Sequence, residues 1–132
     1  MSKVTRYQDL RVWQEGVELS VFVYALTEGF PTREQFGLTN QMRRASVSIA
    51  SNIAEGFGRS TKEFARFVEI ARGSLAELET QAEIAFRVHY LVETQYAELT
   101  EKLTRLGKQL NVFHQRIRTS NQQPATSNQQ PK

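Results

Sequence analysis

The chain has 132 residues, 39% of them hydrophobic, and a formal net charge of +3. This length predicts one domain with its own buried core, and the lack of cysteine excludes disulfides, thiolate metal sites and cysteine nucleophiles. No apolar signal segment occurs near the N-terminus, and no run approaches the roughly 18 apolar residues of a membrane span. We therefore expect a cytoplasmic protein with no membrane partner. The basic balance permits a nucleic-acid partner without requiring one.

The first predicted helix covers about residues 10–28 and follows a lead-in, residues 1–8, that has no pattern. Asp9 is placed to cap this helix, and Gly29 and Pro31 end it. Its apolar residues form two neighbouring stripes, so this helix needs neighbours on two sides. The first stripe comprises Leu10, Trp13, Val17, Val21 and Tyr24. The second comprises Val12, Leu19, Val23 and Leu26, and it indicates either a central position in one bundle or a contact between subunits.

The second predicted helix covers about residues 33–57, with its regular part beginning at Leu38 because Gly37 disfavours a straight first turn. Thr32 and Gln35 have the spacing of a capping box at its start. The apolar stripe consists of Leu38, Met42, Ala45, Ile49, Ile53 and Gly56. A polar row borders this stripe, formed by Gln41, Ser48, Asn52 and Glu55 and continued by Arg59. We interpret this row as structural, fixing helix register, in preference to a ligand site.

The third and fourth predicted helices cover about residues 61–92 and 94–118. Ser60 and Glu63 form a capping box for the third helix, after a tight glycine connection at Gly56 and Gly58. The third helix carries a long core stripe that includes His89, and a second, broken apolar row of Ile70, Ile84 and Val88. The fourth helix has one narrow stripe, which is typical of an outer helix: Leu99, Leu103, Leu106, Leu110, Phe113 and Ile117. Residues 119–132 are rich in Ser, Asn, Gln and Pro, and we expect a disordered tail.

Together these elements predict an all-α protein, an antiparallel up-down-up-down four-helix bundle with short connections. A lone bundle would leave the second apolar stripes in water, so we expect a closed, cyclic homo-oligomer. The candidate contacts between subunits are Val12, Leu19, Val23, Leu26, Ile70, Ile84 and Val88.

No pattern in the chain indicates catalysis, a cofactor or a metal. The segment from Gly56 to Lys62 lacks the spacing of a phosphate-binding loop and follows a helix where such a loop follows a strand. His89 and His114 lack the spacing of metal ligands, and we expect no enzyme activity. A cluster of basic residues on the second and third helices indicates either phosphate contacts or a solvated rim. These residues are Arg43, Arg44, Arg59, Lys62 and Arg66.

Three segments resemble a known family of bacterial proteins. They are YxDLxVWQ at residues 7–14, FGLTxQxRRAxVSIxSNIAEG at 36–56, and IARGSLxELETQ at 70–81. On these motifs the chain is similar, from Tyr7 to Phe113, to the four-helix proteins encoded in intervening sequences of 23S ribosomal RNA genes. Ala50 stands where the family usually has proline, and the Gln-rich tail has no counterpart.

The resemblance implies an antiparallel four-helix subunit, commonly assembled as a cyclic homopentamer, with no established enzymatic activity. More distant relatives, the accessory proteins of diversity-generating retroelements, bind nucleic acid and a reverse transcriptase as basic pentamers. Two hypotheses follow. The chain is an oligomeric scaffold or adaptor that binds structured RNA or DNA through basic faces, or it is a purely structural assembly that binds another protein.

Overall fold

The computed structural model describes residues 4–122, and within that range it contains four α-helices and no strand. The prediction of an all-helical protein with four helices is confirmed. The four helices are α1 (Arg11–Thr27), α2 (Leu38–Gly56), α3 (Thr61–Arg87) and α4 (Glu93–Gln122), joined by short links. Two 3₁₀ turns, η1 (Tyr7–Asp9) and η2 (Thr32–Glu34), precede α1 and α2.

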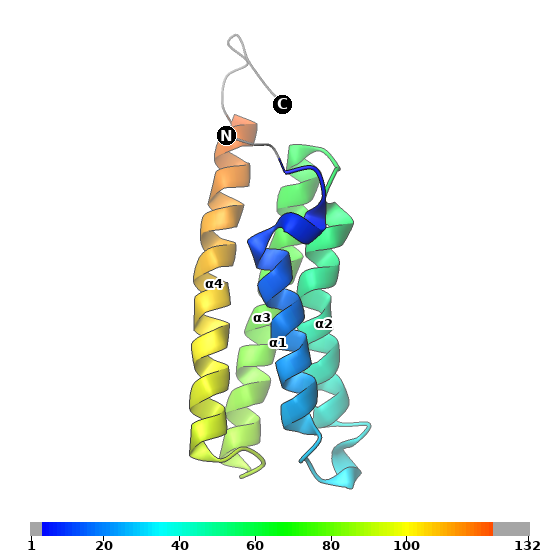
Figure 1. Ribbon diagram of the computed structural model, residues 1–132, viewed down its shortest axis with the longest axis vertical. Helices are drawn as coiled ribbons and strands as arrows, with labels where there is room; N and C mark the ends of the chain where they lie inside the picture. The colour runs from blue at the N-terminus through cyan, green and yellow to red at the C-terminus, as the bar shows by residue number, and fades with distance from the viewer. Residues whose placement is uncertain (1–3, 123–132) are drawn as a thin grey trace.

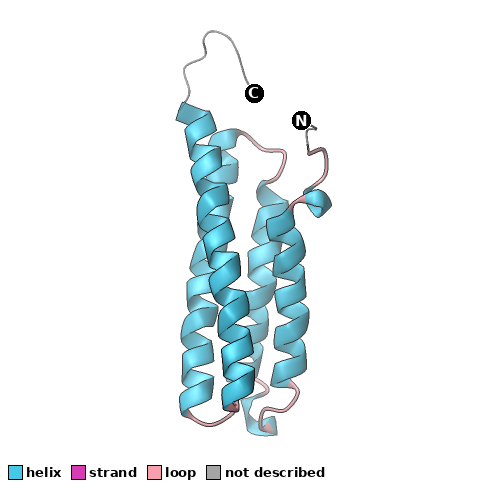
Figure 2. Cartoon of the chain, turned by 60° about the vertical axis from the view of Figure 1, so that its left-hand side comes forward, coloured by secondary structure: helices cyan, strands magenta, loops and turns pink. Residues whose placement is uncertain are grey.

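The helices lie side by side along the long axis of the molecule (Figure 1). In that view the colour gradient runs down α1, up α2, down α3 and up α4. Each helix packs against the next in the chain, and α1 also contacts α4. The view turned by 60° shows the connections at the two ends of the helices (Figure 2). None of the helices between residues 4 and 122 is long and apolar enough to cross a membrane.

The cap of α1 and the end of α3 differ from the sequence predictions. Asp9 does not cap α1, because it lies inside η1 and Leu10 takes the capping position without a side-chain bond. The α3 helix ends at Arg87 instead of about residue 92, since His89 has a left-handed backbone, with φ at 69°. This turn places His89 on the surface, so its prediction as a core residue is wrong. By contrast, Ser60 caps α3 as expected, with its Oγ accepting from the Glu63 amide at 3.1 Å.

The start of α2 depends on Glu34 instead of a capping box. The chain forms η2 and a turn before Leu38, so the regular helix begins at Leu38 as predicted, and residues 33–37 do not belong to it. The Glu34 carboxylate accepts hydrogen bonds from the Leu38 amide at 2.9 Å and from the Tyr90 hydroxyl at 2.8 Å. These two bonds, the Leu38 amide first, hold the pKa of Glu34 below its ordinary value. Glu34 thereby ties the α1–α2 link to the α3–α4 link.

The fourth helix is longer than predicted. It continues to Gln122, so the predicted start of the tail, at Thr119, is too early by at least four residues. The rest of the predicted disordered tail, residues 123–132, lies outside the described residues.

The stripe of α1 that was predicted to contact another subunit faces the core. Val12, Leu19 and Val23 are buried inside the subunit, and Leu26 is half-buried against the same core. On the other stripe, Val21 is 65% exposed and Tyr24 is 45% exposed. The prediction that Val12, Leu19 and Val23 contact another subunit is therefore wrong, because these residues fill the subunit's own core.

The physical reason for this rotation is a close approach of α1 to α2 at a glycine. Gly16 is buried on the same face as Val12 and Leu19, and a Cβ there would lie 3.3 Å from the Ala50 Cβ. Helices approach this closely only where both carry small residues. The inward stripes of the other three helices agree with the sequence, and they supply the largest fully buried aliphatic side chains: Met42, Ile49, Ile53, Leu78, Leu99, Leu106 and Leu110.

A second close contact, at Gly56, generates a stability prediction. A Cβ at Gly56 would lie 2.6 Å from the Phe67 Cβ, so α2 and α3 would have to separate. We expect Gly56→Ala to destabilise the protein by roughly 1–3 kcal/mol through overpacking. Gly73→Ala is the matched control, because nothing lies within 4 Å of a Cβ added there. This substitution should stabilise α3 by roughly 0.5–1 kcal/mol. Urea denaturation at one protein concentration measures both, and equal effects would contradict the contact at Gly56.

Candidate functional site

The polar row beside the core of α2 divides into an interhelical part and a solvent-exposed part. The Ser48 and Ser74 hydroxyls are 2.8 Å apart and join α2 to α3. The Asn52 amide donates to the Ser48 carbonyl at 2.8 Å and to the Ser48 hydroxyl at 2.9 Å. Gln41 is exposed, and Glu55 pairs at the surface with Arg59 at 3.1 Å. The central residues of the row therefore satisfy one another and hold the register of α2 against α3.

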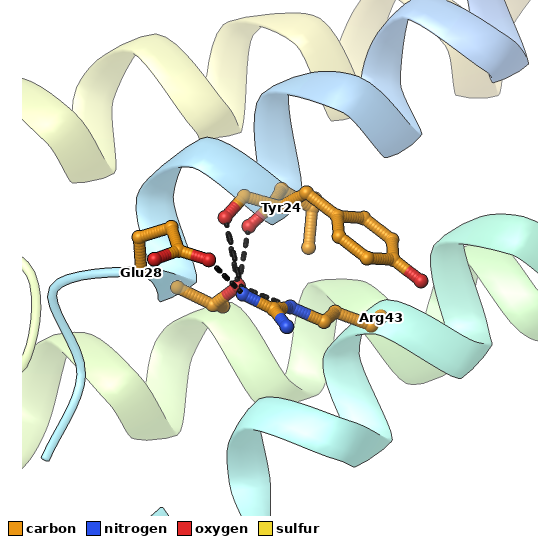
Figure 3. Close-up of polar contacts among 5 residues, drawn as sticks. Tyr24, Glu28 and Arg43 are labelled. Carbon is orange, nitrogen blue, oxygen red and sulfur yellow. Dashed lines mark hydrogen bonds and ion pairs between the residues drawn. The ribbon is translucent and has the colours of Figure 1, made fainter. Parts of the chain in front are cut away.

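Arg43 is a clamp between α1 and α2 (Figure 3). Its Nε donates to the Thr27 hydroxyl at 2.8 Å, and its Nη2 donates to the Tyr24 carbonyl and the Glu28 carboxylate, both at 3.3 Å. The guanidinium lies 4.5 Å from the centre of the Tyr24 ring, and the side chain is only 24% exposed. Arg43 thus binds the carboxyl end of α1, where the helix dipole favours a positive charge. The clamp engages the Nε and Nη2 groups of Arg43 inside the subunit, which disfavours its predicted role as a nucleic-acid contact.

The other four basic residues lie in two places and not in one patch. Arg44 is exposed near the start of α2 and has no ion pair within residues 4–120. It is about 18 Å from the end of the helix at Gly56. The remaining three, Arg59, Lys62 and Arg66, surround the α2–α3 connection, and we call them the basic cluster. The guanidiniums of Arg59 and Arg66 lie 5.0 and 5.7 Å from the centre of the Phe67 ring.

Two apolar surfaces face away from the core. The first is an open groove of about 510 Å³ between α1 and α2, which we call the α1–α2 groove. Its apolar lining includes Trp13, Val17, Val21, Tyr24, Val47 and Ala54. The second surface, the α3 stripe, consists of Ile70, Ile84 and Val88, which are 41–47% exposed. These three residues are free to contact another subunit, as the sequence analysis expects, but Val12, Leu19 and Val23 are not.

The histidines do not form a catalytic arrangement within the described part of the chain. His114 joins α4 to α3, with its Nε2 2.8 Å from the Glu69 carboxylate and its Nδ1 3.4 Å from Arg72. Burial lowers the pKa of His114. Among residues 4–122, no three His, Cys, Asp or Glu side chains come together as metal ligands. The polar side chains near the histidines hold helices together and do not converge on a pocket.

Sequence reasoning missed two interhelical links, one made by Thr27 and one made by Glu15. Thr27 is a buried hydroxyl at the inward position four residues after Val23, where an apolar residue would be expected. Glu15 accepts from Gln109 at 3.2 Å and pairs with Arg105 at 3.5 Å, joining α1 to α4. A polar residue within an inward stripe was the available signal for Thr27. No local signal identifies the partners of Glu15.

The clamp generates a second stability prediction. We expect Arg43→Ala to cost roughly 1–3 kcal/mol, because it removes charged hydrogen bonds to Thr27 and to the end of α1. Arg43→Lys should recover only part of this loss, since an ammonium cannot reproduce the planar fork. Arg66→Ala is the matched control, an exposed arginine whose removal should change stability by less than about 0.5 kcal/mol. Thermal unfolding by circular dichroism gives all three values, and an Arg43→Ala value as small as that of Arg66→Ala would refute the clamp.

Comparison with known proteins places this arrangement in a family. The family model described as 23S rRNA-intervening sequence protein matches residues 8–112. A crystal structure of a protein with unknown function, from the S23 ribosomal protein family of Bacteroides thetaiotaomicron, superposes with a TM-score of 0.70 at 24% sequence identity. The match covers 78% of this chain and 97% of that chain, and it shows a shared fold. No curated protein matches the chain. Because the family model spans most of its length, the chain belongs to the 23S rRNA-intervening sequence protein family.

Proposed function

We propose that this chain is a non-catalytic scaffold subunit that assembles with copies of itself into a closed ring. The observation that carries the proposal is the pair of outward apolar surfaces, the α1–α2 groove and the α3 stripe. Contiguous apolar patches are uncommon on monomeric proteins and usually mark interaction sites. Closed cyclic assembly buries such patches without leaving open ends that would grow into fibres.

Further support for a scaffold comes from the use of the polar side chains. Arg43, Ser48 and His114 all join helices within the subunit. A catalytic site would require polar groups that converge on a substrate pocket. The family resemblance favours five subunits in the ring, and the lack of cysteine is typical of a protein of the reducing cytoplasm.

Nucleic-acid binding is a second candidate function, carried by the basic cluster at the α2–α3 connection. Arg59 and Arg66 lie over the Phe67 ring, and Lys62 lies in the first turn of α3. Glu55 is the only acidic partner with which any of the three forms an ion pair in residues 4–120. Repetition around a ring would bring several such clusters to one polymer at a high effective concentration. If nucleic acid does not bind, the remaining alternative is a structural assembly whose partner is another protein.

Self-assembly is tested by the mass of the protein in solution. Multi-angle light scattering at micromolar concentration should give a discrete mass that is a multiple of the 15.2 kDa subunit, with five subunits expected. A mass that stays at 15.2 kDa over the whole accessible concentration range would contradict the proposal. An unbroken series of growing species would contradict ring closure alone.

Nucleic-acid binding is tested by a gel-shift titration with structured RNA and DNA at about 50 and 200 mM salt, since phosphate contacts release counterions. We expect binding at the lower salt that weakens when Arg59, Lys62 and Arg66 are all replaced by glutamine. A matched triple glutamine variant on α4, at Lys108, Arg116 and Arg118, removes the same charge and should bind more tightly than the cluster variant. Equal losses would assign binding to net charge, and no shift by the wild-type assembly would exclude this second function.

A further inference from the structure

We propose that neighbouring copies meet through two different surfaces, with the α3 stripe of one copy seated in the α1–α2 groove of the next. This inference rests on the proposed self-assembly and specifies its interface. The occupant of the groove is therefore a second copy of this chain. Such a head-to-tail contact repeats around a ring, because each copy offers one groove and one stripe.

The position of the two surfaces on the subunit favours a head-to-tail contact. The α1–α2 groove lies on the side of α2 that meets α1, where Gly16 approaches Ala50. The α3 stripe lies beyond the other side of α2, where Ser48 meets Ser74. A symmetric contact that pairs either surface with itself would leave the other surface in water. One head-to-tail contact covers both.

Charge supports the same pairing. Arg44 lies one helical turn before Val47, which lines the groove. Glu77 lies in the middle of the α3 stripe, seven positions from both Ile70 and Ile84. Both side chains are exposed, and neither forms an ion pair within residues 4–120. Docking the stripe in the groove brings Arg44 next to the partner subunit's Glu77, which would complete an ion pair between opposite charges.

The spacing of residues along the two helices matches this register. Copies in a ring share one orientation along its axis, so the partner's α3 runs antiparallel to α2, as α3 does within the subunit (Figure 1). With the partner's Glu77 beside Arg44, the partner's Ile70 lies about 10 Å toward the Gly56 end of α2, level with Ser51. Ser51 is a small residue in the lining of the groove, so it leaves room for a branched aliphatic side chain. Val47 and Ala54 would then flank the inserted residue.

The inference is tested with two variants that each damage one surface, Val21→Asp in the groove and Ile70→Asp in the stripe. Both positions are exposed, so each variant should remain helical and become monomeric. Mixing the two variants should produce a heterodimer of twice 15.2 kDa and nothing larger, because only one intact groove and one intact stripe remain. Val112→Asp, at an exposed valine of α4, is the control and should assemble like the wild type.

The possible outcomes separate this inference from the proposed function. A wild-type protein that is itself monomeric refutes self-assembly, whereas a ring that survives Ile70→Asp refutes only the head-to-tail contact. A mixture that stays monomeric at the highest soluble concentration also refutes the head-to-tail contact, as does dissociation by Val112→Asp. If either aspartate variant loses helicity by circular dichroism, Val21→Ser and Ile70→Ser replace the pair.

The charge pairing has its own readout. Arg44→Glu and Glu77→Arg should each weaken assembly by at least about fivefold, because each places like charges in contact. Combining both substitutions in one chain should recover most of this loss, since every interface then regains an opposite pair. A double variant as weak as the sum of the two single variants would overturn the assigned register.

Discussion

The contact between Gly16 and Ala50 sets the rotation of α1, and the exposed surfaces of the molecule depend on that rotation. With no side chain at Gly16, α1 lies close against α2 and presents its glycine-bearing stripe to the core. As a consequence, Val21 and Tyr24, on the other stripe of α1, face outward and line the groove. The same rotation brings Thr27 to the Arg43 guanidinium. A larger residue at position 16 would therefore change both the core and the surface offered to a partner.

Polar contacts hold the register of the helices while the apolar core supplies most of the stability. Arg43 joins α1 to α2, the Ser48 and Ser74 hydroxyls join α2 to α3, and Glu15 joins α1 to α4. Each such hydrogen bond contributes on the order of 1 kcal/mol, which is small beside the burial of a leucine stripe. These hydrogen bonds set the register of the helices, because each one aligns a particular residue with a particular neighbour. These polar side chains are thereby engaged in contacts between helices of the same subunit, which agrees with a scaffold.

The sequence predicted the helices well where one stripe was clearly more apolar than the rest. The leucines of α4 repeat without ambiguity, and all from Leu99 to Leu110 are buried as expected. The two stripes of α1 are almost equally apolar, so hydrophobicity alone could not decide which faces inward, and the second stripe was left between a central position in the bundle and a contact between subunits. Gly16 was the missing signal, since a glycine inside a helix often marks a close helix contact. The basic residues show a similar limit, because the use of Arg43 depends on where Thr27 lies after folding.

The single tryptophan provides the most direct test of how copies of this chain meet. Trp13 lines the α1–α2 groove, whereas Ile70 belongs to the α3 stripe on another helix. Acrylamide quenching of Trp13 fluorescence should be compared between the wild-type protein and the Ile70→Asp variant. If the stripe of one copy fills the groove of the next, Trp13 is shielded in the wild type and becomes readily quenched in the variant, although its own subunit is unchanged around it. Equal quenching in an assembled wild type and a monomeric variant would show that the groove stays open to solvent in the assembly.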